Sequence, residues 1–171
     1  MTLLLKLRRM FGCTAMASLI LFPAIAQESV AELQAKFDHE NNSIRKAKLL
    51  VKLGDAQFEE SRRAGKAGDN NAVDATMEKY RDNVHAALEA LKKQHPDAEK
   101  HSNGYRQLEM HVTQGIREVE DSMLAAPPAY KPPLEIVRQD LVSMDQEMIR
   151  LLFPLRPANV KPPAPPAENQ P

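Results

Sequence analysis

The sequence contains almost no cysteine, no tryptophan and no excess of either charge. Cys13 is the one cysteine, and 23 basic residues are balanced by 23 acidic ones. A single cysteine cannot form an intrachain disulfide, a zinc site of several thiolates or a c-type haem attachment. The charge balance gives no reason to expect nucleic acid as a partner, because nucleic-acid-binding domains usually carry a basic excess. These absences remove several classes of function before any motif is considered.

Residues 1–26 have the pattern of a signal peptide. A basic start precedes a mostly apolar run, 10–25, and Ala24-Ile25-Ala26 places small residues where a signal peptidase reads them. The alternative is an uncleaved anchor, but the run is shorter than the roughly 20 residues that span a bilayer. Cleavage after Ala26 would remove Cys13 and leave 20 basic against 23 acidic residues. We therefore expect an exported protein, periplasmic or secreted, with no membrane insertion after cleavage and no cysteine chemistry.

A seven-residue spacing of apolar side chains dominates the first part of the mature chain. It comprises Val30, Phe37, Ile44, Val51 and Phe58. Seven residues are close to two helical turns, so these side chains return to nearly the same face and predict a buried seam of the coiled-coil or bundle type. Ser29 and Glu32 predict a capping box at the start. The polar cluster 41–43 allows either one continuous helix or a break, with Ser43 capping a second helix.

Three further helical stripes follow. The second comprises Val73, Met77, Tyr80, Val84, Ala87 and Leu91. The third comprises Tyr105, Leu108, Val112, Ile116, Val119 and Met123, and the last comprises Leu134, Val137, Leu141, Met144, Met148 and Leu151. We expect Asn71 to cap the second helix, the third to begin at Pro96 or at Ser102, and an extended connector, 127–133, to lead into the last helix at Pro133.

These patterns predict an all-α fold. Residues 27–153 would form an antiparallel bundle of four helices, or five if the first one breaks. From Pro154 to the terminus, seven of the 18 residues are proline. Such a segment has little apolar surface to bury, so we expect a disordered proline-rich tail over 154–171.

Histidines are the first candidates for chemistry at neutral pH. The five are His39, His85, His95, His101 and His111. None lies three or four residues from another, so no helix face offers a ready pair of metal ligands. His85 with Glu89, and His111 with Glu118, lie off the apolar stripes and are interpreted as solvent-facing ion pairs. A metal site assembled across helices is the alternative.

Methionines and charged clusters have equally simple interpretations. Met77, Met123, Met144 and Met148 could ligate copper, but all four lie on apolar stripes, which favours core packing. The acidic groups are interpreted as solvated helix faces. They are Glu118, Glu120 and Asp121, and Asp140, Asp145 and Glu147. A basic run on the first long helix could meet an acidic partner, although it lacks interleaved aromatic residues. It comprises Arg45, Lys46, Lys48, Lys52, Arg62, Arg63 and Lys66.

Two segments carry a resemblance. Residues 45–60, RKAKLLVKLGDAQFEE, and the region from Gly104-Tyr105-Arg106 to Leu152-Phe153-Pro154 resemble a family of small secreted bacterial helical proteins that has no assigned activity. Leu53-Gly54 and Gly68-Asp69 also resemble tetratricopeptide hairpins, although one hairpin does not make a solenoid. The resemblance implies a secreted helical protein and brings no catalytic residues.

Three functions follow as hypotheses. The first is a non-enzymatic protein-interaction or structural component of the bacterial envelope, which binds a protein partner through a helical groove or through the proline-rich tail. The second is a periplasmic ligand or metal carrier in which His and Met side chains meet across helices. The third is a hydrolase with paired carboxylates, which would need a buried acid. Self-association through the heptad seam stays open, and no catalytic, cofactor or metal residue is assigned.

Overall fold

The structure, a computed structural model, describes residues 28–154 and contains five α-helices. They are α1 (Val30–His39), α2 (Ser43–Ala67), α3 (Asn70–Gln94), α4 (Ser102–Ala125) and α5 (Lys131–Leu152), with a 3₁₀ turn, η1 (Pro128–Tyr130), before α5. No strand occurs among these residues. The predicted all-α fold is confirmed, in its five-helix form. The expected signal peptide, 1–26, and the tail beyond Pro154 lie outside the described residues.

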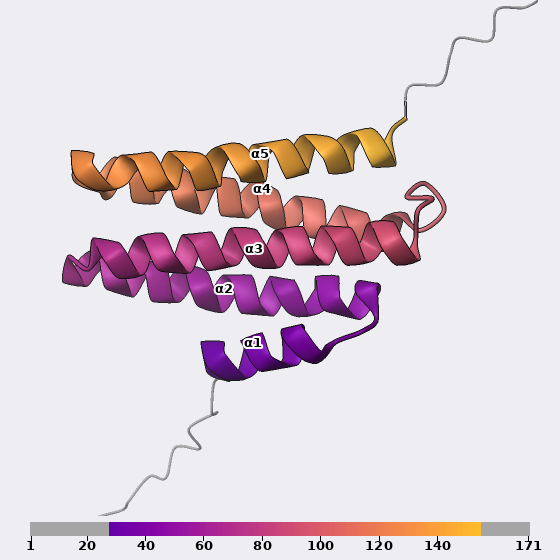
Figure 1. Ribbon diagram of the computed structural model, residues 1–171, viewed down its shortest axis with the longest axis horizontal. Helices are drawn as coiled ribbons and strands as arrows, with labels where there is room; N and C mark the ends of the chain where they lie inside the picture. Colours follow the sequence, from indigo (N-terminus) through magenta and orange to yellow (C-terminus); the bar gives the residue numbers. More distant parts are fainter. Residues whose placement is uncertain (1–27, 155–171) are drawn as a thin grey trace, which may run out of the picture.

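The four long helices form a bundle in which consecutive helices run antiparallel (Figure 1). Helix α2 packs against both α3 and α4, and α5 packs against both α4 and α3. The helices therefore surround one shared core, and α2 and α4 are parallel neighbours. Helix α1 folds back antiparallel along α2, on the side away from α5 (Figure 1).

The chain breaks between α1 and α2, which settles the choice that the sequence left open. Asn42, and not Ser43, caps α2, because the Asn42 side chain accepts a hydrogen bond from the Arg45 amide. The side chain of Gln94 on α3 binds the main chain between α1 and α2. Its Oε1 accepts from the Ser43 amide at 3.1 Å, and its Nε2 donates to the Asn41 carbonyl at 2.7 Å. These bonds satisfy main-chain groups that a turn would otherwise leave unpaired.

The break makes the expectation of one buried seam wrong. Val30 and Phe37 belong to α1, and Ile44 and Val51 of α2 are only partly buried. Of the predicted seam, Phe37 and Phe58 are fully buried, and the buried line on α2 joins Phe58 to Ala47, Leu50 and Leu53, which widen the predicted stripe. Because α2 packs between α1, α3 and α4, its buried surface is wider than one heptad seam and centred on a different face.

Two other boundaries differ from expectation. Asp69 caps α3 by accepting from the Ala72 amide at 3.0 Å, so Asn71 is inside the helix. The predicted extended connector instead makes the turn η1 and enters α5 at Lys131. The prolines that follow occupy its first turn, where a missing amide hydrogen costs nothing. The capping box of Ser29 and Glu32 is confirmed, and α4 begins at Ser102, one of the two expected starts.

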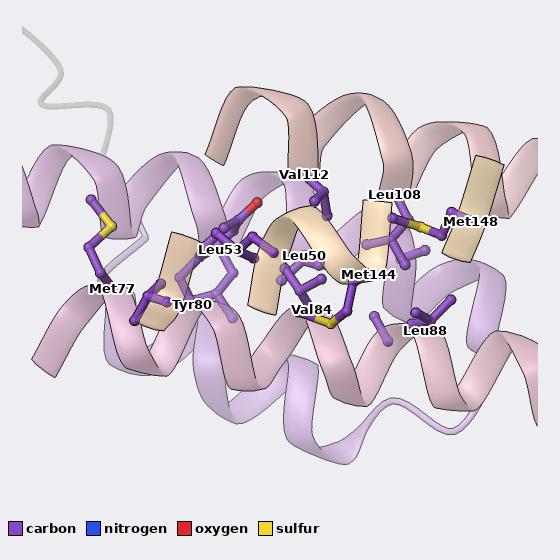
Figure 2. Close-up of a cluster of buried hydrophobic side chains, with 14 of the residues drawn as sticks. Leu50, Leu53, Met77, Tyr80, Val84, Leu88, Leu108, Val112, Met144 and Met148 are labelled. Atoms are coloured by element: carbon purple, nitrogen blue, oxygen red, sulfur yellow. The ribbon is translucent and has the colours of Figure 1, made fainter. Parts of the chain in front are cut away.

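The core lies between the four long helices. Figure 2 shows Leu50 and Leu53 of α2 beside Tyr80 and Val84 of α3, with α4 and α5 contributing from the opposite side. Met77 and Met148 are fully buried, Met144 is buried and Met123 is partly buried against the same cluster. The interpretation of these methionines as core residues is confirmed.

Candidate functional site

The centre of the bundle is an aromatic cluster around Tyr80. Its ring meets the Phe58 ring edge-on, with centroids 4.7 Å apart, and the His111 ring at 5.7 Å. The Tyr80 hydroxyl donates to the main-chain carbonyl of His111 at 3.0 Å. Burial raises the pKa of Tyr80, so the hydroxyl stays a neutral donor. The cluster joins α2, α3 and α4.

Two glycines within helices make room for this cluster. A Cβ at Gly54 would lie 2.1 Å from His111 Nε2, and a Cβ at Gly115 would lie 2.4 Å from Tyr80 Cε1. Neither position accepts a side chain unless the facing ring shifts, which explains why residues of poor helix propensity occur in the middle of α2 and α4.

His111 overturns the interpretation of an exposed ion pair with Glu118. Its side chain is only 4% exposed, and its Nε2 has no hydrogen-bond partner. Burial lowers the pKa of His111, although Asp55, the Gln114 side chain and the Leu50 carbonyl oppose this. Glu118 is paired with Arg62 of α2 instead. His111 lies beside the main apolar stripe of α4, and Phe58 of α2 and Tyr80 of α3 cover its ring. The Nε2 edge of the ring faces Gly54 of α2, where a Cβ would lie only 2.1 Å away.

The other histidines are at the surface or near one end of the bundle. His85 is exposed on α3 and His39 is exposed at the end of α1. The structure does bring His95 and His101 together across the loop between α3 and α4, with ring centroids 4.6 Å apart. Within residues 28–154 no group of three or more His, Cys, Asp or Glu side chains could hold a metal ion.

The acidic residues mostly join neighbouring helices in ion pairs. Glu118 pairs with Arg62 across α4 and α2, and Glu120 pairs with Arg138 across α4 and α5. Asp140 and Glu147 of α5 pair with Arg81 and Lys92 of α3. These residues are partly or well exposed, so each pair adds about 1 kcal/mol or less to stability.

Two carboxyl groups come nearest to the buried acid that the hydrolase hypothesis needs. Burial raises the pKa of Asp74 on α3, with Glu78 adding to the effect, and burial also raises the pKa of Asp145 on α5. Thr113 donates to Asp145 at 3.5 Å. Neither residue is fully buried. The pairing of two such carboxylates stays a prediction.

The strongest candidate for a binding site is a groove between α2 and α4, called here the α2–α4 groove. It has a volume of about 590 Å³ and is lined by Lys48 and Val51 of α2 and by Asn103, Arg106, Gln107, Met110, His111 and Gln114 of α4. Met110 is 70% exposed although it is a large apolar side chain. Helices α2 and α4, which form the two walls of the groove, pack directly against each other.

The structure also divides the predicted basic run. Arg45 pairs with Glu40, Arg62 pairs with Glu59 and Glu118, and Lys46 donates to the Phe37 carbonyl. Lys48 makes no ion pair within the described part of the chain and lines the α2–α4 groove. These residues are neighbours along one helix in the sequence, but their side chains face different parts of the fold.

Comparison of the chain with models of protein families, with curated proteins and with solved structures finds no match. The resemblance to a family of secreted helical proteins therefore stays a prediction. Among residues 28–154, none of the helices has both the length and the apolar character needed to cross a membrane.

Proposed function

We propose that this protein is an exported, non-enzymatic component of the bacterial envelope that binds a protein partner through the α2–α4 groove. One observation supports this above the others: Met110 leaves most of its apolar side chain in solvent while it lines a groove between two packed helices. Exposed apolar side chains next to polar rims are typical of protein-binding surfaces. Export rests on the signal-peptide pattern of residues 1–26.

A site-specific photo-crosslinker at position 110 tests this proposal. The full chain carrying the crosslinker is expressed in its own host, and the envelope is irradiated. We expect one discrete adduct between the protein and a partner. The control places the same crosslinker at Ile136 of α5, which is 57% exposed and does not line the groove. Equal adduct patterns from the two positions would contradict the proposal.

A metal carrier is the second candidate, because the structure places His95 beside His101. Two imidazoles are fewer ligands than the three or four of most protein sites, so weak binding is expected. The buried Met77 and Met148 would not take part. Excess zinc, nickel or copper should raise the melting temperature through this pair, because binding to the native state stabilises it. The rise should disappear in His101→Ala and persist in His85→Ala.

A further inference from the structure

The lining of the α2–α4 groove is positively charged. Lys48 and Arg106 line it from its two walls, and no carboxylate is among the lining residues. Neither cation makes an ion pair within residues 28–154, unlike Arg62, which lies on the same helix as Lys48 and pairs with Glu59 and Glu118. Asp55 accepts from Gln114 at 3.4 Å but is not itself among the lining residues. The groove therefore offers two uncompensated positive charges.

Apolar side chains line the groove about one helical turn after each of these charges. Val51 of α2 is partly buried and Met110 of α4 is exposed. Methionine is flexible and polarisable, so it adapts to apolar side chains of different shape. An occupant that brought only negative charge would leave Met110 in water, and an occupant that brought only apolar groups would leave Lys48 and Arg106 unpaired in a partly desolvated site.

Polar amides complete the lining. The side chains of Asn103 and Gln107 make no hydrogen bond within the described residues, so both can still donate and accept. Such side chains suit the main-chain groups of an incoming peptide segment. A bound inorganic anion would use mainly the amide donors and leave their carbonyl acceptors without a partner, whereas a peptide main chain can use both.

A contrasting cavity between α1 and α2 shows that the basic character is local. That cavity is lined by Glu28, Glu59 and Glu60, with Arg63 as its one cation, and has a volume of about 780 Å³. An acidic segment would be repelled there and attracted to the α2–α4 groove.

We infer that the α2–α4 groove takes an acidic segment of a partner protein, with carboxylates paired to Lys48 and Arg106 and an apolar side chain on Met110. This inference rests on the proposed function and names the chemistry of the partner. Charge pairing would steer and orient the segment, and contact with Met110 would supply apolar burial.

The probe is a fluorescein-labelled peptide of about 16 residues, roughly four helical turns, made of glutamate with leucine at every third or fourth position. We expect it to bind the mature chain, with affinity that falls between low and high salt, since exposed charges are screened. A peptide with lysine in place of glutamate should not bind. Lys48→Glu combined with Arg106→Glu should weaken binding at least about tenfold, and Met110→Ala should weaken it several-fold.

The control is the double variant Arg63→Glu and Lys66→Glu. Both residues are exposed, neither lines the groove, and the net charge changes by the same amount. Equal loss of binding in the two double variants would overturn the inference, as would equal binding of the lysine peptide. Self-association that Lys48→Glu abolishes in light scattering would also overturn it, because a second copy would then be the occupant. A crosslink from position 110 without peptide binding would remove this inference and leave the proposed function standing.

Discussion

The hydroxyl of Tyr80 donates a hydrogen bond to the main-chain carbonyl of His111 at 3.0 Å, which links the middle of α3 to the middle of α4. The bond is buried, and the ring that carries it packs against Phe58 of α2. Three of the four long helices therefore meet at one side chain. The same contact fixes the position of the helix that forms one wall of the α2–α4 groove.

Tyr80→Phe should destabilise the protein without altering its fold. The variant keeps the ring and its packing but removes the donor, so the expected loss is about 1 kcal/mol, as for a typical buried hydrogen bond. Urea unfolding followed by circular dichroism measures this loss. An unchanged free energy of unfolding would show that the bond contributes nothing beyond ring packing.

Gly115→Ala should be more damaging than its helix propensity suggests. Alanine is the better helix former by about 1 kcal/mol, but its Cβ would lie 2.5 Å from the Tyr80 hydroxyl, and a buried ring has little room to move. We expect a net loss of about 2 kcal/mol or more, as in other overpacked cores.

Gly65→Ala is the matched control for that substitution. A Cβ at Gly65 meets only Val73 Cγ2, at an ordinary 3.8 Å, and the position is exposed within α2. This variant should gain up to about 1 kcal/mol from propensity alone. If both glycine variants were stabilised, the close approach of Tyr80 to Gly115 would be contradicted.

These contacts show what the sequence could and could not predict. The 3.6-residue spacing of Val73, Met77, Tyr80 and Val84 was enough to predict a helix and its buried face, because periodicity depends only on local geometry. It did not predict the burial of His111 or Asn83, which lie one residue before Val112 and Val84 of the stripes. Such flanking positions become buried when a helix has neighbours on several sides, and one sequence does not reveal those neighbours.

The α2–α4 groove was beyond prediction for the same reason. Lys48 and Arg106 are far apart in the sequence and belong to helices whose adjacency follows from the bundle arrangement. Gly54 and Gly115 were the available signal of close packing between helices, since glycine within a helical pattern usually has a packing reason. They mark the close approach around Tyr80 but do not say which ring fills the space.

His111 should make stability depend on pH. Its pKa is lowered in the folded state, so the unfolded chain takes up the proton first as the pH falls below about 6.5. The contribution of the neutral His111 ring to the free energy of unfolding is therefore fully present above that pH. It is lost as the pH falls through the pKa of His111 in the folded state. One such group changes the free energy of unfolding by at most about 1.4 kcal/mol per pH unit.

Urea unfolding between pH 7.5 and pH 5 tests this dependence by comparing wild type with His111→Gln. The variant should be less stable at high pH, because the core loses a ring, and its stability should fall less steeply with acid. His85→Gln, which changes an exposed histidine, should keep the wild-type slope. Parallel slopes for wild type and His111→Gln would show that another group accounts for the acid sensitivity.

The amide pair between Gln34 and Asn83 should control how firmly α1 is attached. Gln34 Nε2 donates to Asn83 Oδ1 at 3.0 Å, and Asn83 Nδ2 donates back to Gln34 Oε1 at 2.9 Å. Asn83 Nδ2 also lies 3.5 Å from Oε1 of the buried Gln57. Asn83→Ala removes the acceptor and the donor that Gln34 uses. Helix α1 then loses these side-chain hydrogen bonds to α3 and is left with its packing on α2.

Hydrogen exchange of the α1 amides measures the consequence. Loss of a buried polar network costs about 1–3 kcal/mol, and here the loss falls on the shortest helix. We expect α1 to exchange about tenfold faster or more in Asn83→Ala, while the slowest amides of α3 and α4 change less. His85→Ala, an exposed change two residues away on α3, should leave α1 protected. Equal acceleration in all five helices would mean that α1 opens only when the whole bundle unfolds, and that the amide pair stabilises the bundle as one cooperative unit.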